Sequence, residues 1–543
     1  MEKMISNMTF SEGLAQLLEI NRIKEVCICP GSRNTPLTLS FLKNSFLNCT
    51  SYIDERAAAF FTLGISKVSA KPSVILTTSG TAVANLLPAV IEADLSTTPL
   101  IIISADRPER LQNTGENQTI NQKNIFDKFV RSSIHIEVSA IDSNEIFEKM
   151  NDTINSALGS YGNNPPGPIH INIAFDEPLV DTIKKNKINF RTDDIKTLHK
   201  IFNLPEYERP IIICGNIKGE YETNEIIELS KKINAPILAD PLSELRFKIK
   251  HKNILSYYDF FIKNMIDEPD LIIRFGKKPV SKKLNKWLNN FKNKIILFTK
   301  YNGYNDDTNS IYLARLDDIK NINKANQTWI QTFVNLEENI SNKIKKYYED
   351  SYFYEGNIIY HLIKKMNAND NLFIGNSMSV RNLEKFVPNI DNKINIFSNR
   401  GASGIDGLIA TGIGVSYFNK KNKTNIILGD ISFFYDSNSL LIAKQQNINI
   451  NIFIMNNSGG QIFNQLPYAQ KNDNNFEKFW ITPVDLNIKS ICETYNANYF
   501  YMSSIKEIKT NFDSILNQDG INIIEVVCNE KNIFNIDLEL TKI

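Results

Sequence analysis

Carboxylate and amide side chains follow two apolar runs in the last third of the chain. Gly429-Asp430 comes directly after the run 426–428, and Asn456-Asn457 comes after the run 450–455. Mg²⁺ takes oxygen ligands in octahedral geometry and is usually held by one or two carboxylates together with water and phosphate oxygens. An Asp, an Asn and a backbone carbonyl would therefore suffice to hold Mg²⁺ on a diphosphate. Taken alone, the same residues are also ordinary turn residues.

One glutamate, Glu55, lies at the start of an apolar helical pattern that runs to Leu63. A glutamate in that place commonly acts only as a partner for the helix dipole. In thiamine-diphosphate enzymes, a first-domain glutamate hydrogen bonds the aminopyrimidine ring and favours the imino tautomer that takes a proton from the thiazolium carbon. Glu55 with Asp430 and Asn457 resembles that arrangement, although Ile431 stands where the family usually has glycine.

Six further segments make the resemblance specific. They are Cys-Pro-Gly-Ser-Arg-Asn-Thr-Pro (29–36), Thr-Ser-Gly-Thr-Ala (78–82), Ser-Ala-Asp-Arg-Pro (104–108), Gly-Glu-Asn-Gln (115–118), Ser-Asn-Arg-Gly-Ala-Ser-Gly-Ile-Asp-Gly (398–407) and Asn-Ser-Gly-Gly-Gln-Ile-Phe (457–463). Together they look like the 2-succinyl-5-enolpyruvyl-6-hydroxy-3-cyclohexene-1-carboxylate synthase family of menaquinone biosynthesis. The resemblance is close at both ends of the chain and loose in the middle.

The resemblance implies a transferase with thiamine diphosphate and Mg²⁺, or Mn²⁺, as cofactors. Such an enzyme decarboxylates 2-oxoglutarate on the cofactor and adds the succinyl carbanion equivalent to isochorismate, which gives 2-succinyl-5-enolpyruvyl-6-hydroxy-3-cyclohexene-1-carboxylate and CO2. The implied partners are these two small molecules. The implied assembly is a homodimer or homotetramer with active sites at subunit interfaces.

The resemblance also assigns roles to residues around the cofactor. Catalysis falls to Glu55 and Gln118. The cofactor contacts are Glu55, Ser403, Gly404, Ile405, Gly429, Asp430, Ile462 and Phe463, and the metal ligands are Asp430, Asn457 and the carbonyl of Gly459. Ile405 would wedge the cofactor into a bent form, and Ile462, Phe463 and Leu466 would exclude water. Packing in a hydrophobic core is the alternative for these four apolar residues.

The two substrates of this family are multiply anionic, and arginine binds carboxylates bidentately. By resemblance, isochorismate would be bound by Ser32, Arg33, Arg107, Asn117, Gln118 and Lys282. The distal carboxylate of the succinyl unit would be held by Ser377, Arg381 and Arg400. Arg107 and Arg400 could instead stabilise turns, and the adjacent Lys282 and Lys283 could be a solvated pair. So many cations in loops of a near-neutral chain favour a focused anionic site.

The elements that position these residues are short apolar strands alternating with amphipathic helices, which is typical of parallel α/β sheets. The predicted strands are 25–29, 73–77, 100–104, 169–173, 210–214, 271–274, 294–298, 371–374, 426–428, 450–455 and 523–527. Turns at 30–33, 79–81, 375–377 and 429–430 lead from strands into helices. Such turns line the ligand crevice of a parallel sheet.

The length of 543 residues suggests about three domains. Charge-rich stretches at 184–200 and 342–350 place the divisions, so we expect a pyrimidine-binding domain at 1–190, a central α/β domain at 191–345, and a diphosphate- and metal-binding domain at 346–543. The resemblance implies that each is a mainly parallel sheet flanked by helices.

The formal net charge of +1 gives no reason to expect nucleic acid as a partner. The chain's 6 cysteines show no metal-ligand spacing, and Cys27 and Cys29 alternate within an apolar strand, so we expect them in the core. Neither a signal peptide nor a membrane-spanning run is present, which favours the cytoplasm and no membrane partner.

Three alternative functions stay open. Another thiamine-diphosphate decarboxylase or carboligase, such as acetolactate synthase, would act on less charged substrates. A cofactor-binding module without catalysis is weakened by Glu55 and the predicted metal pair. A Rossmann dinucleotide binder is weakened because no G-x-G-x-x-G follows any strand.

Overall fold

The computed structural model describes residues 5–141, 145–159, 164–181, 200–265, 267–302, 306–467, 469, 475–527 and 531–542. The chain forms two compact units. Unit 1 comprises Met1–Thr197, Asn399–Asn419 and Asn438–Ile442, and unit 2 comprises Leu198–Ser398, Lys420–Ser437 and Ala443–Ile543.

Unit 1 is built on one six-stranded parallel sheet in the order β2-β1-β3-β4-β6-β5. Its strands are β1 (Glu25–Ile28), β2 (Asn48–Ser51), β3 (Ser73–Thr77), β4 (Leu100–Asp106), β5 (Ser133–Glu137) and β6 (Pro168–Ala174). The inner strands β3, β4 and β6 are buried along their whole length. Burial on both faces explains their near-continuous runs of Ile, Leu and Val.

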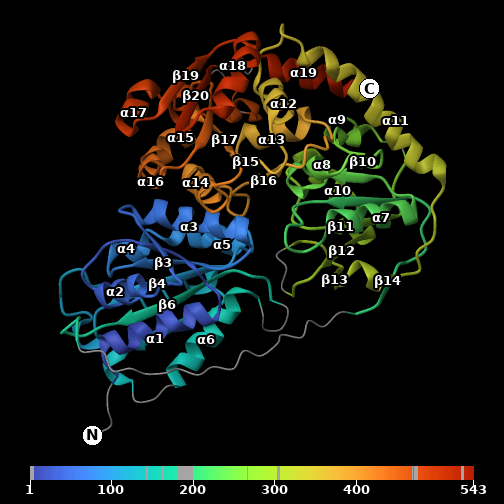
Figure 1. Cartoon of the computed structure of the whole chain (residues 1–543). Helices are drawn as coiled ribbons and strands as arrows, with labels where there is room; N and C mark the ends of the chain where they lie inside the picture. The colour runs from blue at the N-terminus through green and yellow to red at the C-terminus, as the bar shows by residue number, and fades with distance from the viewer. Residues whose placement is uncertain are drawn as a thin grey trace. The chain divides into compact units, whose positions relative to one another are not determined.

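Helices lie on both faces of this sheet, as Figure 1 shows. One face packs against α1 (Asn7–Ile20), α2 (Thr35–Lys43) and α6 (Glu145–Ala157), which share a core with alternate strand residues such as Val26, Leu76 and Ile103. The other face carries α3 (Glu55–Ser69) and α5 (Leu87–Leu95), and α4 (Thr81–Ala84) follows β3.

Helix α14 (Leu408–Phe418) comes from the last third of the chain but packs along α3 within unit 1. Glycines make this close approach possible. A Cβ on Gly414 would overlap the carbonyl oxygen of Phe61, and one on Gly64 would overlap that of Thr411. The two backbones are therefore in direct contact, which fixes the spacing between the helices.

Unit 2 contains two more six-stranded parallel sheets, in the orders β10-β9-β8-β11-β12-β13 and β16-β15-β17-β18-β20-β19. The first consists of β8 (Pro210–Cys214), β9 (Ile237–Ala239), β10 (Ile254–Leu255), β11 (Leu271–Phe275), β12 (Ile295–Thr299) and β13 (Ile311–Leu313). The second consists of β15 (Asn371–Ile374), β16 (Asn395–Phe397), β17 (Thr424–Gly429), β18 (Ile450–Asn456), β19 (Asn498–Met502) and β20 (Ile521–Val527). A separate pair joins β7 (Phe202–Asn203) and β14 (Ile319–Lys320).

The helices of unit 2 cover both of its large sheets (Figure 1). Those of the first half are α7 (Thr223–Ile233), α8 (Leu245–Lys248), α9 (Tyr258–Phe261), α10 (Lys282–Leu288) and α11 (Gln327–Ile344). Those of the second half are α12 (Glu355–Lys365), α13 (Met378–Phe386), α15 (Asp430–Asp436), α17 (Ile488–Tyr495), α18 (Ile505–Asn517) and α19 (Lys531–Thr541), while α16 (Leu440–Gln445) crosses the boundary between the units.

The α/β class is confirmed, and each predicted strand is present with ends shifted by at most a few residues. The predicted turns do lead into helices, namely α2, α4, α13 and α15. The charge-rich stretch 342–350 is helical through Tyr348 and buries Ile344 and Tyr347. The other stretch, 184–199, lies outside the described residues.

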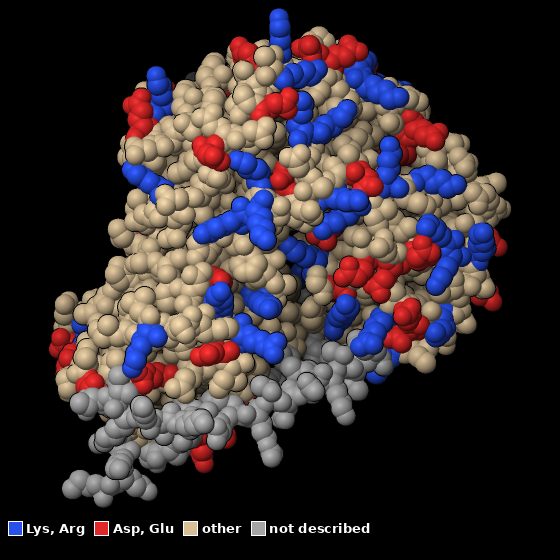
Figure 2. All heavy atoms as spheres, in the orientation of Figure 1, with Lys and Arg blue, Asp and Glu red and all other residues tan. Residues whose placement is uncertain are grey.

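Cys27 and Cys29 are buried and free, as expected of core residues, and burial raises the pKa of Cys27 to about 11. Cys528 lies outside the described residues. Within the described parts of the chain, no helix has the length and apolarity needed to span a bilayer. Positive and negative side chains are interspersed on the face seen in Figure 2, as the near-zero net charge suggests.

Candidate functional site

The carboxyl edge of the unit 1 sheet gathers predicted residues of the first third, together with Ser79, which had no predicted role. Arg33 follows β1, Glu55 follows β2, Ser79 follows β3 and Arg107 follows β4. Since β2, β1, β3 and β4 are successive neighbours in the sheet, their carboxyl ends lie side by side. Ligands of open parallel sheets bind at this edge.

Arg107 is buried and is held by residues of two other turns. Its Nη1 donates to Ser79 Oγ at 2.7 Å and to the backbone carbonyl of Gln118 at 2.9 Å. Gln118 donates in turn from Nε2 to the Ser79 carbonyl at 2.9 Å. Arg107, Ser79 and Gln118 therefore form one hydrogen-bonded group, and both Gln118 and the adjacent Asn117 are exposed.

Arg33 is buried at the same edge, with 9% of its surface exposed. Its Nη1 donates to the Phe175 carbonyl at 3.0 Å and lies 3.2 Å from a carboxylate oxygen of the exposed Glu177. Burial lowers the pKa of Arg107, and the positive charge of Arg33 lowers it further. Two buried cations that repel each other form a site that an anion would stabilise. Ser32, one residue before Arg33, is exposed.

Glu55 is the first residue of α3 and is partly buried. The helix begins there because Asp54, the N-cap, accepts a hydrogen bond from Ala57 N at 3.0 Å. Asp54 therefore satisfies the helix end, which leaves the Glu55 carboxylate available for another partner.

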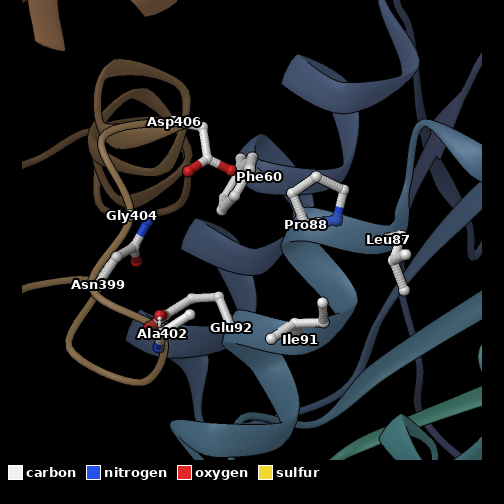
Figure 3. A pocket seen from close by; sticks show the side chains of 9 residues that line it. All are labelled: Phe60, Leu87, Pro88, Ile91, Glu92, Asn399, Ala402, Gly404 and Asp406. Carbon is white, nitrogen blue, oxygen red and sulfur yellow. Dashed lines mark hydrogen bonds between the residues drawn. The ribbon is translucent and has the colours of Figure 1, made fainter. Parts of the chain in front are cut away.

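The segment 399–407 also belongs to unit 1 and carries Arg400, Ser403, Gly404 and Ile405. Arg400 is partly buried and Ser403 is exposed. Ile405 is 39% exposed, so its side chain does not serve as core packing. This loop and helices α3 and α5 line a cavity of about 240 Å³, drawn in Figure 3.

In unit 2, Asp430 and Gly459 meet at the carboxyl edge of the last sheet. Gly429 at the end of β17 pairs with Met455 of β18, which places the two following turns next to each other. Asp430 Oδ2 accepts from Gly459 N at 2.7 Å, and Oδ1 accepts from Ile431 N at 2.9 Å. Burial raises the pKa of Asp430, although these backbone donors oppose the shift.

Asn457 lies in the same turn and is partly buried, and its backbone carbonyl accepts from Gln461 Nε2 at 3.0 Å. Gly459 has φ +115°, and a Cβ there would overlap the Ile481 carbonyl, so only glycine fits. Asp430 thus contacts the turn that carries Asn457 and Gly459. Carboxylate, amide and carbonyl oxygens are the donors that suit a hard cation. No group of three His, Cys, Asp or Glu side chains suited to a metal occurs among the described residues.

Ser377 lies in the turn after β15, the strand next to β17, and Arg381 lies in the first turn of α13. Ser377 is the N-cap of α13, and the Arg381 guanidinium donates to its carbonyl. Gln465 Nε2 lies 3.2 Å from Met378 Sδ, which brings the turn 461–465 near this helix start. In that turn Ile462 is partly buried and Phe463 is 39% exposed, and the following Leu466 is partly buried. None of the three is a buried core residue.

The two lysines at the start of α10 differ. Lys283 binds Asp259 at 3.2 Å and Asp537 at 3.7 Å, so its charge is already compensated within unit 2. Lys282 is exposed. Of the pair, Lys282 is thus the one available to a ligand.

The structure brings most of the predicted residues together at two sheet edges, while the 399–407 residues pack on α3 and α5 and Lys282 lies apart at the start of α10. Arg400 belongs to unit 1, whereas Ser377 and Arg381 belong to unit 2. Their shared role in binding the distal carboxylate of the succinyl unit therefore stays a prediction. Ser79 lies in one of the motif segments but had no predicted role, and Glu92, a buried acid of α5, was not predicted at all. A single charged residue within the otherwise apolar stretch 86–93 was the available signal for Glu92.

Comparison with known proteins gives matches over most of the chain. Three family models match: "Thiamine pyrophosphate enzyme, N-terminal TPP binding domain" at residues 8–125, "Middle domain of thiamine pyrophosphate" at 185–374, and "Thiamine pyrophosphate enzyme, C-terminal TPP binding domain" at 384–526. The chain is 33% identical to 2-succinyl-5-enolpyruvyl-6-hydroxy-3-cyclohexene-1-carboxylate synthases of Staphylococcus aureus strains MSSA476 and USA300 over 539 residues, covering 94% of this chain and 93% of each relative.

Proposed function

The chain belongs to the 2-succinyl-5-enolpyruvyl-6-hydroxy-3-cyclohexene-1-carboxylate synthase family of thiamine pyrophosphate enzymes, and we propose that it catalyses the reaction for which that family is named. The enzyme takes 2-oxoglutarate and isochorismate and releases CO2 and 2-succinyl-5-enolpyruvyl-6-hydroxy-3-cyclohexene-1-carboxylate. This reaction belongs to menaquinone biosynthesis.

The observation that supports this substrate pair best is the buried Arg33–Arg107 group in unit 1. Isochorismate carries two carboxylates, and a charge-assisted hydrogen bond contributes about 1.5–3 kcal/mol. Burial and the Arg33 charge lower the pKa of Arg107, while Glu116, Asp106 and Glu177 oppose the shift, so a bound carboxylate would add to a partial compensation. Acetolactate synthase, the alternative, acts on smaller and less charged substrates that have no need of two buried cations.

We propose that Asp430, the Asn457 side chain and the Gly459 carbonyl hold Mg²⁺ or Mn²⁺ against the cofactor's diphosphate. The support is the burial of Asp430, whose raised pKa a bound cation would reverse. When bound, thiamine diphosphate supplies the carbon that attacks the 2-oxo group and stabilises the charge left by decarboxylation. Gly429, Ser403, Gly404 and Ile405 would contact the cofactor.

The remaining roles belong to side chains of this chain. Glu55 would hold a proton at the pyrimidine ring nitrogen, and Gln118 would orient a proton-carrying group next to the substrate. Ser32, Asn117 and Lys282 would join Arg33 and Arg107 around isochorismate, while Ser377, Arg381 and Arg400 would hold the distal carboxylate of 2-oxoglutarate. Ile462, Phe463 and Leu466 would exclude water from the reacting carbon.

We further propose the domains 1–190, 191–345 and 346–543, since each range holds one six-stranded sheet. A homodimer or homotetramer with active sites at subunit interfaces would cover the exposed Ile405 and Phe463. Light scattering of the purified protein measures the assembly, and a monomer that is fully active would contradict it.

The direct test of the proposed function is incubation of the protein with thiamine diphosphate, Mg²⁺, 2-oxoglutarate and isochorismate. The expected result is loss of isochorismate with formation of the succinyl product. Pyruvate in place of 2-oxoglutarate is the matched control, because it lacks the distal carboxylate. Turnover of pyruvate to acetolactate would support the alternative.

A further inference from the structure

A buried ion pair joins the two helices on one face of the unit 1 sheet. Lys67 Nζ of α3 lies 3.2 Å from Glu92 Oε1 of α5, and the two side chains are only 9% and 3% exposed. A buried pair is weak support for stability by itself, because loss of hydration offsets the attraction between the charges. The contacts of Glu92 beyond Lys67 indicate another role.

Both carboxylate oxygens of Glu92 accept hydrogen bonds from the backbone of the 399–407 segment. Gly401 N donates to Oε1 at 3.1 Å, and Ala402 N donates to Oε2 at 2.7 Å. Figure 3 shows Glu92 extending from α5 toward Ala402. An ionised carboxylate can accept at both oxygens, whereas an amide has only one acceptor. Lys67 compensates the charge that this arrangement requires.

Close packing holds the same segment. A Cβ on Gly401 would lie 2.8 Å from the Glu92 carbonyl oxygen and 2.8 Å from Ser96 N, so any other residue would push the loop away from α5. At the far end of the segment, a Cβ on Gly407 would overlap the ring of Phe60 of α3. The loop is thus fixed at both ends on the helices of unit 1.

We propose that the Lys67–Glu92 pair is a positioning device for the 399–407 loop. By binding two consecutive backbone N–H groups, Glu92 fixes Arg400 just before them and Ser403, Gly404 and Ile405 just after them. Because Lys67 lies on α3, the same pair also links the loop to that helix. This inference rests on the proposed function, which assigns Glu55 and the loop residues to the cofactor and the substrate.

The first test measures backbone hydrogen–deuterium exchange at Gly401 and Ala402 without cofactor. Glu92→Gln is expected to speed exchange at these amides by about tenfold, the size of one lost charge-assisted hydrogen bond. Asp94→Asn is the matched control, since Asp94 lies on the same helix but pairs with Arg131. Unchanged exchange in Glu92→Gln, or an equal increase in Asp94→Asn, would overturn the proposal.

The second test uses the loaded enzyme. In Glu92→Gln, we expect the thiamine diphosphate concentration for half-saturation to rise and CO2 release from 2-oxoglutarate to slow by about tenfold, with KM for isochorismate unchanged. Gly401→Ala should give the same pattern with the carboxylate intact. A general loss of structure would instead raise KM for isochorismate as well, and that outcome would contradict a positioning role.

If the Glu92→Gln variant does not fold, the same two measurements are made on the Gly401→Ala and Lys67→Met variants. Wild-type exchange and wild-type cofactor saturation in both variants would overturn the proposal. Failure of the proposed function is a separate outcome, because it would appear as absence of the reaction in the wild-type protein while leaving the exchange result unaffected.

Discussion

Burial disfavours the charged forms of both Asp430 and Arg107. It raises the pKa of Asp430 and lowers the pKa of Arg107, the latter with the help of the Arg33 charge. A nearby opposite charge reverses such shifts. Each residue is therefore suited to a ligand of opposite charge, a cation at Asp430 and a carboxylate at Arg107.

Asp430→Ala is expected to abolish Mg²⁺-dependent binding of thiamine diphosphate, because the cation would lose its one proposed charged protein ligand. Thermal shift with cofactor and metal measures this, and the exposed Asp485→Ala variant controls for net charge. Since protonation of Asp430 competes with the cation, metal binding should also weaken as the pH falls through its raised pKa. If cofactor and metal stabilised the Asp430→Ala variant against heat as much as the wild type, the metal would have to bind elsewhere.

Glu55→Gln is expected to leave cofactor binding largely intact but to suppress proton loss from C2 of the bound cofactor, because a neutral amide cannot favour the imino tautomer. Deuterium exchange at C2, followed by NMR, measures this step. Asp54→Asn removes a charge at the same helix end while retaining a capping side chain, so its exchange should stay near wild type. Fast exchange in Glu55→Gln would remove Glu55 from the mechanism.

The two arginine groups should affect different halves of the reaction. Arg33→Ala and Arg107→Ala should release CO2 from 2-oxoglutarate at near wild-type rate but lose capture of isochorismate by about 10²–10³-fold, as expected for one contact of about 3–4 kcal/mol. Arg381→Ala and Arg400→Ala should slow CO2 release itself. The control is Arg110→Ala, whose side chain is 62% exposed beside Asp176.

Rapid mixing with 2-oxoglutarate alone measures the first half, and product formation with isochorismate measures the second. If Arg33→Ala slows CO2 release as severely as Arg400→Ala does, the four arginines act through one shared electrostatic field. The assignment of two separate binding sites would then be wrong.

At the scale of the elements, the predicted strands comprise all the inner strands of the three large sheets except β9. An inner strand of a parallel sheet is buried on both faces, so it appears in the sequence as a continuous apolar run. The edge strands β2, β5, β10, β13, β16 and β19 were missed. They bury less of their surface, as in β2 and β13, or are very short, as in β10, so their sequences carry little apolar pattern. The inner strand β9 was missed because it has only 3 residues.

Helix α13, which begins at the proposed succinyl site, contains a buried acid at Glu384. Burial, with the nearby Asp259 and Asp240, raises its pKa to about 8, against the opposing Arg246 charge and a hydrogen bond from Tyr258. The folded state therefore binds a proton that the unfolded state releases near the ordinary glutamate pKa of 4.5. The stabilisation of the folded state by this bound proton is complete below that pKa and is lost as the pH rises to about 8.

The free energy of unfolding, measured with urea, is accordingly expected to fall between about pH 5 and about pH 8. Glu384 would account for a decrease of up to about 1.4 kcal/mol per pH unit. Glu384→Gln keeps the shape without the titration, so its pH dependence should be shallower. Parallel pH profiles of the two proteins would show that Glu384 does not carry a raised pKa in the fold.

At the scale of the whole molecule, the site residues are spread over both compact units and over most of the chain. Most of the motif segments located them because they follow strands, where a parallel sheet exposes its ligand-binding edge, whereas 115–118 follows no strand directly. Contacts between distant segments could not be predicted in this way. The hydrogen bonds from Gly401 and Ala402 to Glu92 join positions that no local pattern connects.

With a net charge of +1 and both signs interspersed over the visible face (Figure 2), the molecule has no strong overall field to attract anions. Recognition of two anionic substrates must then come from the local, buried cations. The proposed function therefore depends on the chemistry of the two sheet edges rather than on the composition of the chain.

The most direct test of the proposed synthase function is the ratio of CO2 released to isochorismate consumed by the wild-type enzyme with thiamine diphosphate, Mg²⁺ and 2-oxoglutarate. We expect one CO2 for each isochorismate, with little consumption of isochorismate when 2-oxoglutarate is omitted. Steady CO2 release without loss of isochorismate would contradict the synthase function while leaving the thiamine-dependent decarboxylation intact.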